Sequence, residues 1–514
     1  MPADLPLNDS LRKRYAFKVG TNGVGAAVSL LTQAIVPRGL GPAAFGDFNY
    51  LTSFFTQFIG FWDPGMSQAF LTKLAQRPQD AGMVAFFWRF AVLIGLATVA
   101  FGVLGPAFPW ARLLWPGQRA MAIALAAGLV CLTWAAQILG NMADAYGVTV
   151  RTEMVKMLQK LAGLALVAAL FWGGRLDLTN YFLCLYAASV LLIAGTWHSL
   201  RGHAPAPAQV WSPGGEAGPR YLHEFLDYAR PLLAYSIIGF LVNIVDRWLL
   251  QVFGGSQQQG FFGLAYQIGA FCFLFVGAMT PLLMREFAIA HGRADREEMA
   301  RLFRRNVPVL VCVAAAFSCF VAVQADRITA IMGGSGFSAA GPAVLIMAYY
   351  PVYQAYGQLG AALFYATGQT RQYSRIGIAV MFLGLPATYF MLAPAHLHGL
   401  GWGASGLALK TLLLQFVSVN ALLYFNTKYL KLSFWTYLFQ QVAVLVGFTL
   451  LAVGARTCAC AFPGGNALAE LLYAGLTYSA ALGALVWLFP QAVGLARADI
   501  EVLLAGIGRF ASSR

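Results

Sequence analysis

Long apolar spans divide this chain along its whole length, and they restrict its possible folds more than any other feature. Of its 514 residues, 59% are hydrophobic and 11% charged, whereas a soluble domain is about half apolar and a quarter charged. Fourteen spans approach the ~20 residues that a helix needs to cross a bilayer. They are Phe17–Pro37, Ala44–Leu71, Met83–Leu104, Met121–Asn141, Met154–Trp172, Tyr181–Leu200, Pro231–Phe253, Phe261–Met284, Val307–Val323, Ala343–Tyr365, Ile376–Leu392, Gly401–Tyr424, Trp435–Ala455 and Ala467–Leu488. Because a backbone in lipid must satisfy its own hydrogen bonds, we expect an all-α polytopic membrane protein.

Positive charges fall into alternate gaps between these spans. Lys18, Lys156 and Lys160 lie near the starts of their spans and are counted with the adjoining tail or gap. On this count the even-numbered gaps and the two tails hold 25 of the 34 lysines and arginines, the odd-numbered gaps hold six, and three lie deeper inside spans. Basic loops stay in the cytoplasm, so we expect both termini on the cytoplasmic side of a bacterial inner membrane. The net charge of +14 then reflects this bias and contact with anionic membrane lipid rather than with nucleic acid.

The spans form two halves and a short extension. The expected organisation is an N-terminal six-helix lobe over 1–200, a cytoplasmic linker over 201–230, a C-terminal six-helix lobe over 231–425, and two further helices with a cytoplasmic tail over 426–514. The first hairpin of each half carries one pattern, Gly41-x4-Gly46-x-Phe48 and Gly255-x4-Gly260-x-Phe262. This echo predicts parallel repeats, and transporters commonly place the substrate path between such repeats.

Polar side chains recur at three- and four-residue spacing within several spans, which puts them on one helix face. The two most informative stripes are Asn22, Ser29 and Gln33 in the first span and Tyr350, Gln354 and Gln358 in the tenth. Such a face lines either a wet cavity or another helix. Aromatic rings beside amides suit a bulky polar ligand such as a glycan, and tight helix packing is the alternative.

Three cations, Arg89, Arg247 and Lys410, lie inside expected spans. A charge at mid-bilayer costs at least ~2.5–3.5 kcal/mol, so each needs a carboxylate, water or an anionic ligand. Carboxylates inside the spans are few, and Asp246 should not face Arg247 because adjacent helix residues point in different directions. For Arg89 the alternative is extension of the side chain to the cytoplasmic surface. The excess of cations favours an anionic substrate.

Several segments resemble the corresponding parts of polysaccharide flippases. They are Arg38-Gly-Leu-Gly-Pro-Ala-Ala-Phe-Gly46 with Asp63-Pro-Gly65, Asp246-Arg247-Trp-Leu-Leu250 with Gly260-Phe-Phe-Gly-Leu-Ala265, and Gly334-Ser-Gly-Phe337 with Tyr365-Ala-Thr-Gly-Gln369 and Gly401-Trp-Gly-Ala-Ser-Gly406. Over roughly residues 15–429, the chain is similar to Wzx-type lipid-linked oligosaccharide flippases of the multidrug/oligosaccharidyl-lipid/polysaccharide (MOP) exporter superfamily. It departs at Pro64, where the family pattern has leucine, and this proline should kink the inner end of the helix.

The resemblance implies alternating access by two six-helix lobes. The cargo would be an oligosaccharide on undecaprenyl pyrophosphate, for O-antigen, capsule or exopolysaccharide. Arg247 and Lys410 would bind the head-group charge, with Arg89 and Arg38 as lesser candidates. The expected sugar contacts are Gln33, Tyr350, Gln354 and Gln358, with Asn22 as a further substrate-binding residue, and the candidate gating or ion-coupling acids are Asp63 and Asp246. Candidate partners are membrane lipid, a coupling proton or sodium ion, a polysaccharide polymerase and chain-length or export proteins.

Two other classes of protein are alternatives to this interpretation. An ion-coupled multidrug or cation antiporter of the same superfamily would rely on acids in its pocket. A membrane enzyme would need either a large outward loop rich in arginine, for a polymerase, or a buried histidine, for an acyltransferase, and neither pattern is present. His396-x-His398 offers only two metal ligands, and no P-loop motif occurs. We therefore expect no enzyme activity, metal or cofactor.

Overall fold

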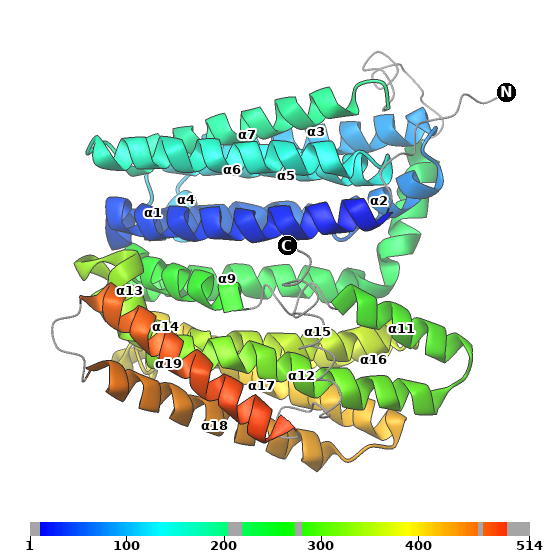
Figure 1. Ribbon diagram of the computed structural model, residues 1–514. Coiled ribbons are helices and arrows are strands. Elements are labelled where there is room, and N and C mark those ends of the chain that lie inside the picture. Colours follow the sequence, from blue (N-terminus) through cyan, green and yellow to red (C-terminus); the bar gives the residue numbers. More distant parts are fainter. Residues whose placement is uncertain (1–10, 204–217, 273–279, 461–465, 491–514) are drawn as a thin grey trace, which may run out of the picture. The chain divides into compact units, whose positions relative to one another are not determined.

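The computed structural model describes residues 11–203, 218–272, 280–460 and 466–490, and within these ranges the regular structure is entirely helical (Figure 1). Eleven of the described helices are long and apolar enough to cross a membrane. The expected all-α polytopic membrane fold is thereby confirmed. The chain separates into two compact units, Met1–Gly260 and Phe261–Arg514, so residues 231–260 group with the N-terminal helices.

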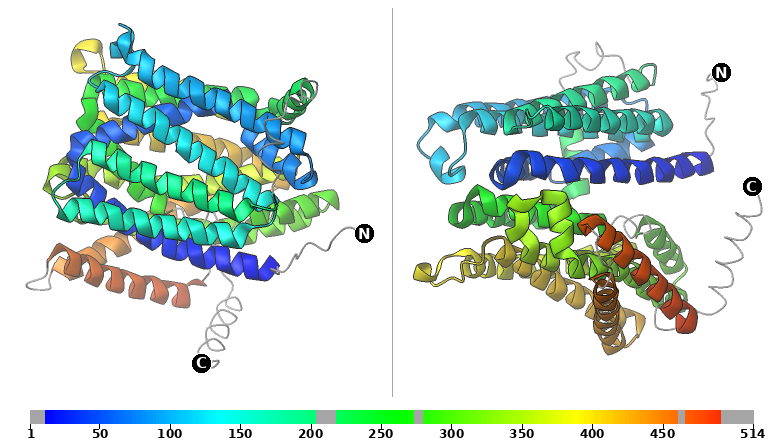
Figure 2. Two further views of the ribbon diagram at one scale, coloured as in Figure 1. Left: turned by 90° about the horizontal axis from the view of Figure 1, so that it is seen from above. Right: turned by 60° about the vertical axis from the view of Figure 1, so that its left-hand side comes forward.

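The first unit is a bundle with an aromatic core. Its elements are α1 (Leu11–Trp62), α2 (Met66–Gln76), α3 (Ala81–Leu104), η1 (Gly105–Ala107), α4 (Ala111–Leu114), α5 (Ala120–Ala145), α6 (Thr149–Trp172), α7 (Leu178–Leu200) and the first part of α9 (Gly218–Cys272). α5 packs against α3 and α7, and α7 also packs against α6 (Figure 2). In the core, Phe70 stacks on Phe87 with ring centroids 4.1 Å apart, and Trp115 is buried among phenylalanines of α1 and α3.

The second unit contains the end of α9 and the remaining helices. They are α11 (Thr280–Gly292), α12 (Arg296–Val323), α13 (Ala325–Gly333), η2 (Ser335–Ala340), α14 (Gly341–Ala348), α15 (Tyr350–Ala366), α16 (Thr370–Leu392), η3 (Ala395–Leu397), α17 (Gly403–Leu430), α18 (Phe434–Cys460) and α19 (Ala467–Leu488). The last two helices lie together, α18 packing on α12 and α19 on α18 (Figure 2). Arg456 of α18 donates to both oxygens of Asp326 at 2.9 and 2.7 Å, and Arg327 pairs with Glu470 of α19. The two helices are thus fixed to this unit by ion pairs with the start of α13.

Two helices are too long for a single crossing. α1 has 52 residues and α9 has 55, which corresponds to about 80 Å each, against a hydrocarbon core of about 30 Å. Each is interrupted by one glycine, Gly41 with φ 72° and ψ 170°, and Gly255 with φ 70° and ψ −174°. Only glycine adopts this conformation readily. Each long helix therefore supplies two of the expected spans, joined by a turn with almost no loop.

Two expected spans are not continuous helices. α1 ends at Trp62 and α2 begins at Met66, so the proline of the Asp63–Gly65 segment interrupts the second span, as predicted. The tenth span, expected as one helix, divides at Tyr349 into α14 and α15, because Pro351 in the first turn of α15 has no N–H to continue the ladder. The eighth expected span includes residues 273–279, which lie outside the described part.

An ionic cluster joins the start of α9 to the turn between α2 and α3. Glu224 lies 3.2 Å from Lys73 Nζ and also accepts a hydrogen bond from Arg77. Beside it, Tyr221 donates a hydrogen bond of 2.7 Å to Asp80, the N-cap residue of α3. The hydrogen bond from Arg77, aided by Lys73, lowers the pKa of Glu224. The cluster fixes the amphipathic start of α9 to the first unit.

Replacing Glu224 by glutamine should lower the thermal stability of the purified protein by about 1–3 °C at neutral pH, because Arg77 and Lys73 lose their counterion. Because folding lowers the pKa of Glu224, its ionised carboxyl group stabilises the folded state fully at pH values above its ordinary pKa of 4.5. That contribution is lost as the pH falls through the lowered pKa. Wild type and Glu224→Gln should therefore differ at neutral pH and converge in acid, as measured by thermal unfolding in detergent.

The control for this experiment is Glu298→Gln, whose carboxylate pairs with Arg301 one turn away on an exposed helix face. Its loss should change the unfolding temperature less, because the pair connects no separate elements. Equal unfolding temperatures for wild type and Glu224→Gln at neutral pH would contradict the stabilising role of the cluster.

Candidate functional site

The two glycine-kinked turns lie against each other within the first unit. A Cβ atom added to Gly46 would be 1.7 Å from the carbonyl oxygen of Ser256, and one added to Gly260 would be 2.1 Å from that of Pro42. No side chain fits at either glycine. We call this pair of backbone contacts the hairpin contact. The charge pattern of the sequence places it at the outer end of the spans.

The hairpin contact is reciprocal. Pro42 and Ser256 each follow the kink glycine of their own helix, and Gly46 and Gly260 each lie five residues after it. The glycine of each hairpin thus meets the carbonyl group that follows the kink of the other. This is the arrangement expected when two equivalent surfaces contact each other, as in a two-fold symmetric interface. The repeated glycine pattern of the sequence therefore has a packing cause, since it allows two turns to approach at backbone distance.

Amide side chains surround the hairpin contact. Gln118 donates to Asp47 Oδ1 at 2.6 Å and to Ser256 Oγ at 3.3 Å. Gln251, which is buried, donates to Ser256 Oγ at 3.2 Å and to the carbonyl of Pro116 at 3.1 Å. These bonds attach the segment after α4 to both hairpins, so the turns and this segment form one hydrogen-bonded assembly.

Arg247 lies beside this assembly on α9 and is half-buried. Its Nη1 donates to Gln259 Oε1 at 3.2 Å, and the Gln259 amide donates back to the Arg247 carbonyl. Gln259 is fully buried. The neighbouring Trp248 donates its indole N–H to the carbonyl of Leu113 at 2.7 Å. A movement of the hairpin that carries Gln259 would therefore also reposition the guanidinium of Arg247.

Asp63 occupies the break between α1 and α2. It accepts hydrogen bonds from the Ser67 N–H at 2.8 Å, from the Ser67 hydroxyl and from Trp134 Nε1 at 3.3 Å. Both carboxylate oxygens are used, so Asp63 stabilises the first turn of α2 and attaches it to α5. Protonation would remove the negative charge from these bonds, which fits a gating or coupling role; that role stays a prediction.

The remaining candidates of the first unit have different surroundings. Arg38 is exposed on α1, and Arg89 of α3 and Asp246 of α9 are half-buried. Gln33 is half-buried, and its Oε1 has no hydrogen-bond partner among the described residues. Asn22 belongs to α1, but its side chain lies outside the described part.

Lys410 is the one buried cation among the described side chains. It is 4% exposed on α17 and packs over Gly384 of α16, where an added Cβ would lie 3.3 Å from Lys410 Cε and 3.5 Å from Nζ. The sequence has no aspartate or glutamate between Asp326 and Glu470. The helices from α14 to α18 therefore offer no carboxylate to this ammonium group, and an anion that reached it would meet no competing acid from them.

The stripe on α15 contacts three neighbouring helices. Its contacts are the ring pair Tyr266–Tyr350 with centroids 6.3 Å apart, the hydrogen bond from Gln415 to Gln354 of 2.9 Å and that from Thr280 to Gln358 of 3.2 Å. The three stripe residues are half-buried. Each thus combines an inter-helix contact with some surface that a sugar could meet.

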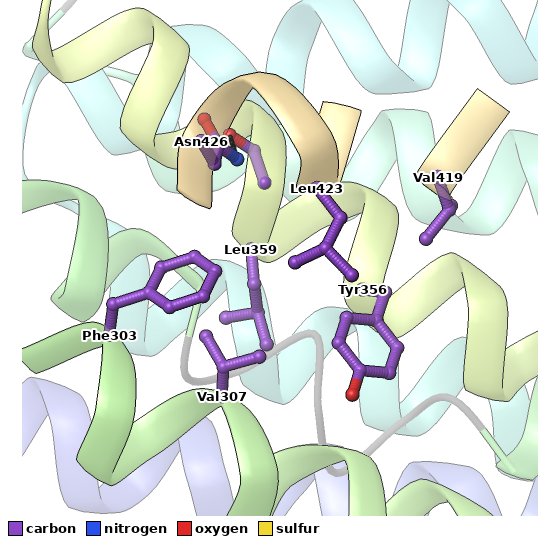
Figure 3. A pocket seen from close by; sticks show the side chains of 8 residues that line it. Phe303, Val307, Tyr356, Leu359, Val419, Leu423 and Asn426 are labelled. Atoms are coloured by element: carbon purple, nitrogen blue, oxygen red, sulfur yellow. Dashed lines mark hydrogen bonds between the residues drawn. The ribbon is translucent and has the colours of Figure 1, made fainter. Parts of the chain in front are cut away.

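Another side of α15 faces a small internal pocket (Figure 3). Its lining residues are Phe303, Val307, Tyr356, Leu359, Gly360, Val419, Leu423 and Asn426, from α12, α15 and α17. These walls are mainly apolar, and the pocket is too tight for a water molecule. Tyr356 therefore belongs to the helix packing of the second unit, which was the alternative considered for the tyrosines of this span.

Three amides of this site, Gln118, Gln251 and Gln259, are not among the residues predicted from the sequence. The available signal was their position, because all three lie near the kink glycine of α9 or in the turn after α4. Polar residues beside a turn that contains a glycine at positive φ are candidates for stabilising that turn by side-chain hydrogen bonds. Their partners come from distant parts of the chain, and periodicity within a single span gave no indication of them.

No protein-family model and no protein of curated function matches the chain. A solved structure of the lipid II flippase MurJ, in an inward closed conformation, has a TM-score of 0.68 and 12% identity over 92% of this chain and 99% of that chain. An inward-facing multidrug resistance MATE family transporter of the MOP superfamily has a TM-score of 0.61 and 14% identity, over 79% and 95%. An outward-facing MATE family transporter has a TM-score of 0.51 and 13% identity, over 83% of this chain and 97% of that chain. The chain therefore shares the fold of these transporters.

Replacing Gly46 by alanine should separate the hairpins, because its methyl group would overlap the Ser256 carbonyl. Overpacking of this kind costs about 1–3 kcal/mol, so we expect at least a roughly fivefold rise in the exposure of the buried Gln251 position. The measurement is the labelling rate of Gln251→Cys, in a chain whose other cysteines are replaced, by a membrane-impermeant maleimide.

Gly23→Ala is the matched control, because Gly23 lies on the same helix and no atom stands within 4 Å of its added Cβ. Labelling at the control rate in Gly46→Ala would show that the hairpin contact does not restrict access. Gly260→Ala, at the reciprocal position, should behave like Gly46→Ala.

Proposed function

We propose that this protein moves undecaprenyl-pyrophosphate-linked oligosaccharide across the bacterial inner membrane by alternating access. The observation that carries the proposal is Lys410, a buried lysine within a series of helices that contain no carboxylate. Burying an ammonium group is costly unless an anion or dipoles compensate it. A pyrophosphate supplies negative charge and several strong acceptor oxygens. The fold shared with a lipid II flippase supports this choice, since that protein is named for moving a lipid.

The residues of each unit have separate tasks in this proposal. In the second unit Lys410 binds pyrophosphate oxygens, and Tyr350, Gln354 and Gln358 contact sugars through ring faces and amides. In the first unit Arg247 supplies a second positive charge, whose position depends on Gln259 and hence on the hairpin contact. Arg89, Arg38, Gln33 and Asn22 are lesser substrate-contact candidates.

The hairpin contact provides a device for alternation. When it is formed, the first unit is closed at the end that the charge pattern assigns to the outside. Separation of the two hairpins would break only two close backbone approaches and a few amide hydrogen bonds, each worth about 1 kcal/mol. Opening and closing at that modest cost would expose the first unit to the outer side during part of the cycle.

An ion-coupled multidrug or cation antiporter is the second candidate. The shared fold with MATE transporters favours it, and so does Asp63, a half-buried acid whose protonation would alter the start of α2. In that case the acid rather than the lysine determines transport, and expression of the protein confers drug resistance.

Lys410→Met should abolish most transport of the lipid-linked oligosaccharide. Hydrogen bonds to charged groups contribute about 1.5–3 kcal/mol, so we expect a loss of roughly tenfold to hundredfold. The measurement is the leaflet distribution of lipid-linked oligosaccharide in a strain that lacks the protein and receives wild type or variant. Arg247→Ala should reduce transport as well, and the double variant should retain least.

Lys428→Met is the matched control, because Lys428 is exposed on the same helix and its loss should leave transport unchanged. Normal clearance of the cytoplasmic leaflet by Lys410→Met would refute the role of this lysine. An absence of cargo accumulation without the protein would refute the flippase itself. Drug resistance that depends on Asp63, tested with Asp63→Asn, would then establish the antiporter.

A further inference from the structure

An open pocket lies at the start of α16, at the end of the second unit that the charge pattern assigns to the cytoplasm. Its volume is about 490 Å³, and its lining residues are Gln369, Arg371, Gln372, Arg375, Ile376 and Phe425. Four of the six side chains are hydrogen-bond donors, and the other two are apolar. None of them belongs to the site proposed above, so the transport proposal gives no reason for this arrangement.

The two arginines of this pocket have no counterion among the described residues. Arg371 and Arg375 are one turn apart on α16, a spacing at which like charges repel. Both side chains are exposed, and within the described part of the chain neither has a hydrogen bond or ion pair. Because the sequence contains no acid between Asp326 and Glu470, neighbouring positions on α15, α16 and α17 cannot neutralise them. The pocket therefore concentrates positive charge that an external anion would compensate.

The backbone adds to this positive potential. α16 begins after Gln369, whose side chain does not cap the helix and instead donates to Thr367 Oγ1 at 3.0 Å. The first N–H groups of a helix have no intrahelical acceptor, and the helix dipole makes this end positive. They supplement the arginine pair, which remains the main reason to expect an anion here.

The apolar residues indicate which kind of anion fits. Ile376 is the first residue of the eleventh expected span, and Phe425 lies on α17 beside it in the pocket wall. In the expected topology the donors therefore lie at the membrane surface, and the apolar wall lies where the lipid chains begin. A free inorganic anion would leave this wall unused, whereas an amphiphile with an anionic head group would contact both parts.

We propose that this pocket binds the phosphate of an anionic membrane lipid, with the Arg371 and Arg375 guanidinium groups donating to the phosphate oxygens. Arginine suits phosphate because its planar donors match two oxygens at once, and basic pockets between helices on the cytoplasmic side bind phospholipid head groups in other membrane proteins. Ile376 and Phe425 contact the beginning of the lipid chain. Two lipids offer this chemistry, a bulk anionic phospholipid and a pyrophosphate-linked carrier lipid, so the inference does not depend on the proposed function.

The test is a binding measurement on the full-length protein in detergent micelles. Phosphatidylglycerol and undecaprenyl pyrophosphate are titrated separately, and bound lipid is counted by native mass spectrometry. Arg371→Gln/Arg375→Gln should weaken binding of at least one of these lipids by roughly tenfold or more, given about 1 kcal/mol per arginine near a lipid surface. The control is Arg285→Gln/Arg293→Gln, which removes the same charge from exposed positions on the same predicted face.

The outcomes separate the two lipids and can overturn the proposal. Selective loss of phosphatidylglycerol binding would identify a phospholipid site, and selective loss of undecaprenyl pyrophosphate binding would identify a docking site for the carrier. If Arg371→Gln/Arg375→Gln and the control Arg285→Gln/Arg293→Gln bind lipid equally well, the site is refuted, because the position of the removed positive charge would then not affect binding. Inorganic phosphate that competes as strongly as the lipids would refute the role of the apolar wall, which Phe425→Ala tests directly.

Discussion

A polypeptide in hydrocarbon finds no water for its N–H and C=O groups, so this chain crosses the membrane as helix and interrupts its helices only at defined points. Those points coincide with glycine or proline. Gly41 and Gly255 reverse the chain at the predicted outer end, and Pro64 divides the second span near its inner end. The hairpin contact, the Arg247–Gln259 pair and the hydrogen bonds of Asp63 all depend on these interruptions. At the break between α1 and α2, Asp63 accepts hydrogen bonds from the Ser67 N–H that begins α2 and from Trp134 of α5.

Most of the fold could be predicted from the sequence because its signals are local. Span length predicts the crossings, charge alternation predicts their orientation, and the repeated glycines mark both kinked turns. The division at Tyr349 was not predicted, because the hydrophobic span continues past it and Pro351 alone did not distinguish a kink from a break. The partners of the candidate residues could not be predicted either. Gln259 reaches Arg247 only because the kink returns the chain, and such contacts depend on three-dimensional packing.

The two units differ in where their charged side chains lie and how these are paired. In the first unit acids and bases occur together, as in the cluster around Glu224, and they connect elements at the membrane surface. In the second unit Arg456 pairs with Asp326 near the ends of α18 and α13, while Lys410 is buried on α17. A surface pair contributes little stability and is easily replaced. A buried cation is costlier than a surface one, so Lys410 is the charge of this unit on which the transport proposal depends.

The long stretch without carboxylates also decides where this protein can store protons. Near neutral pH, carboxyl groups of shifted pKa and imidazoles are the usual proton carriers, and between Asp326 and Glu470 the only such groups are the two histidines before α17. Helices α14 to α18 therefore carry no carboxylate that could exchange a proton during a conformational cycle. A proton gradient that acts through a carboxylate would have to act elsewhere, for example through Asp63 in the first unit. The positive charges of the second unit would respond to membrane voltage, which is worth about 2.3 kcal/mol per charge for each 100 mV.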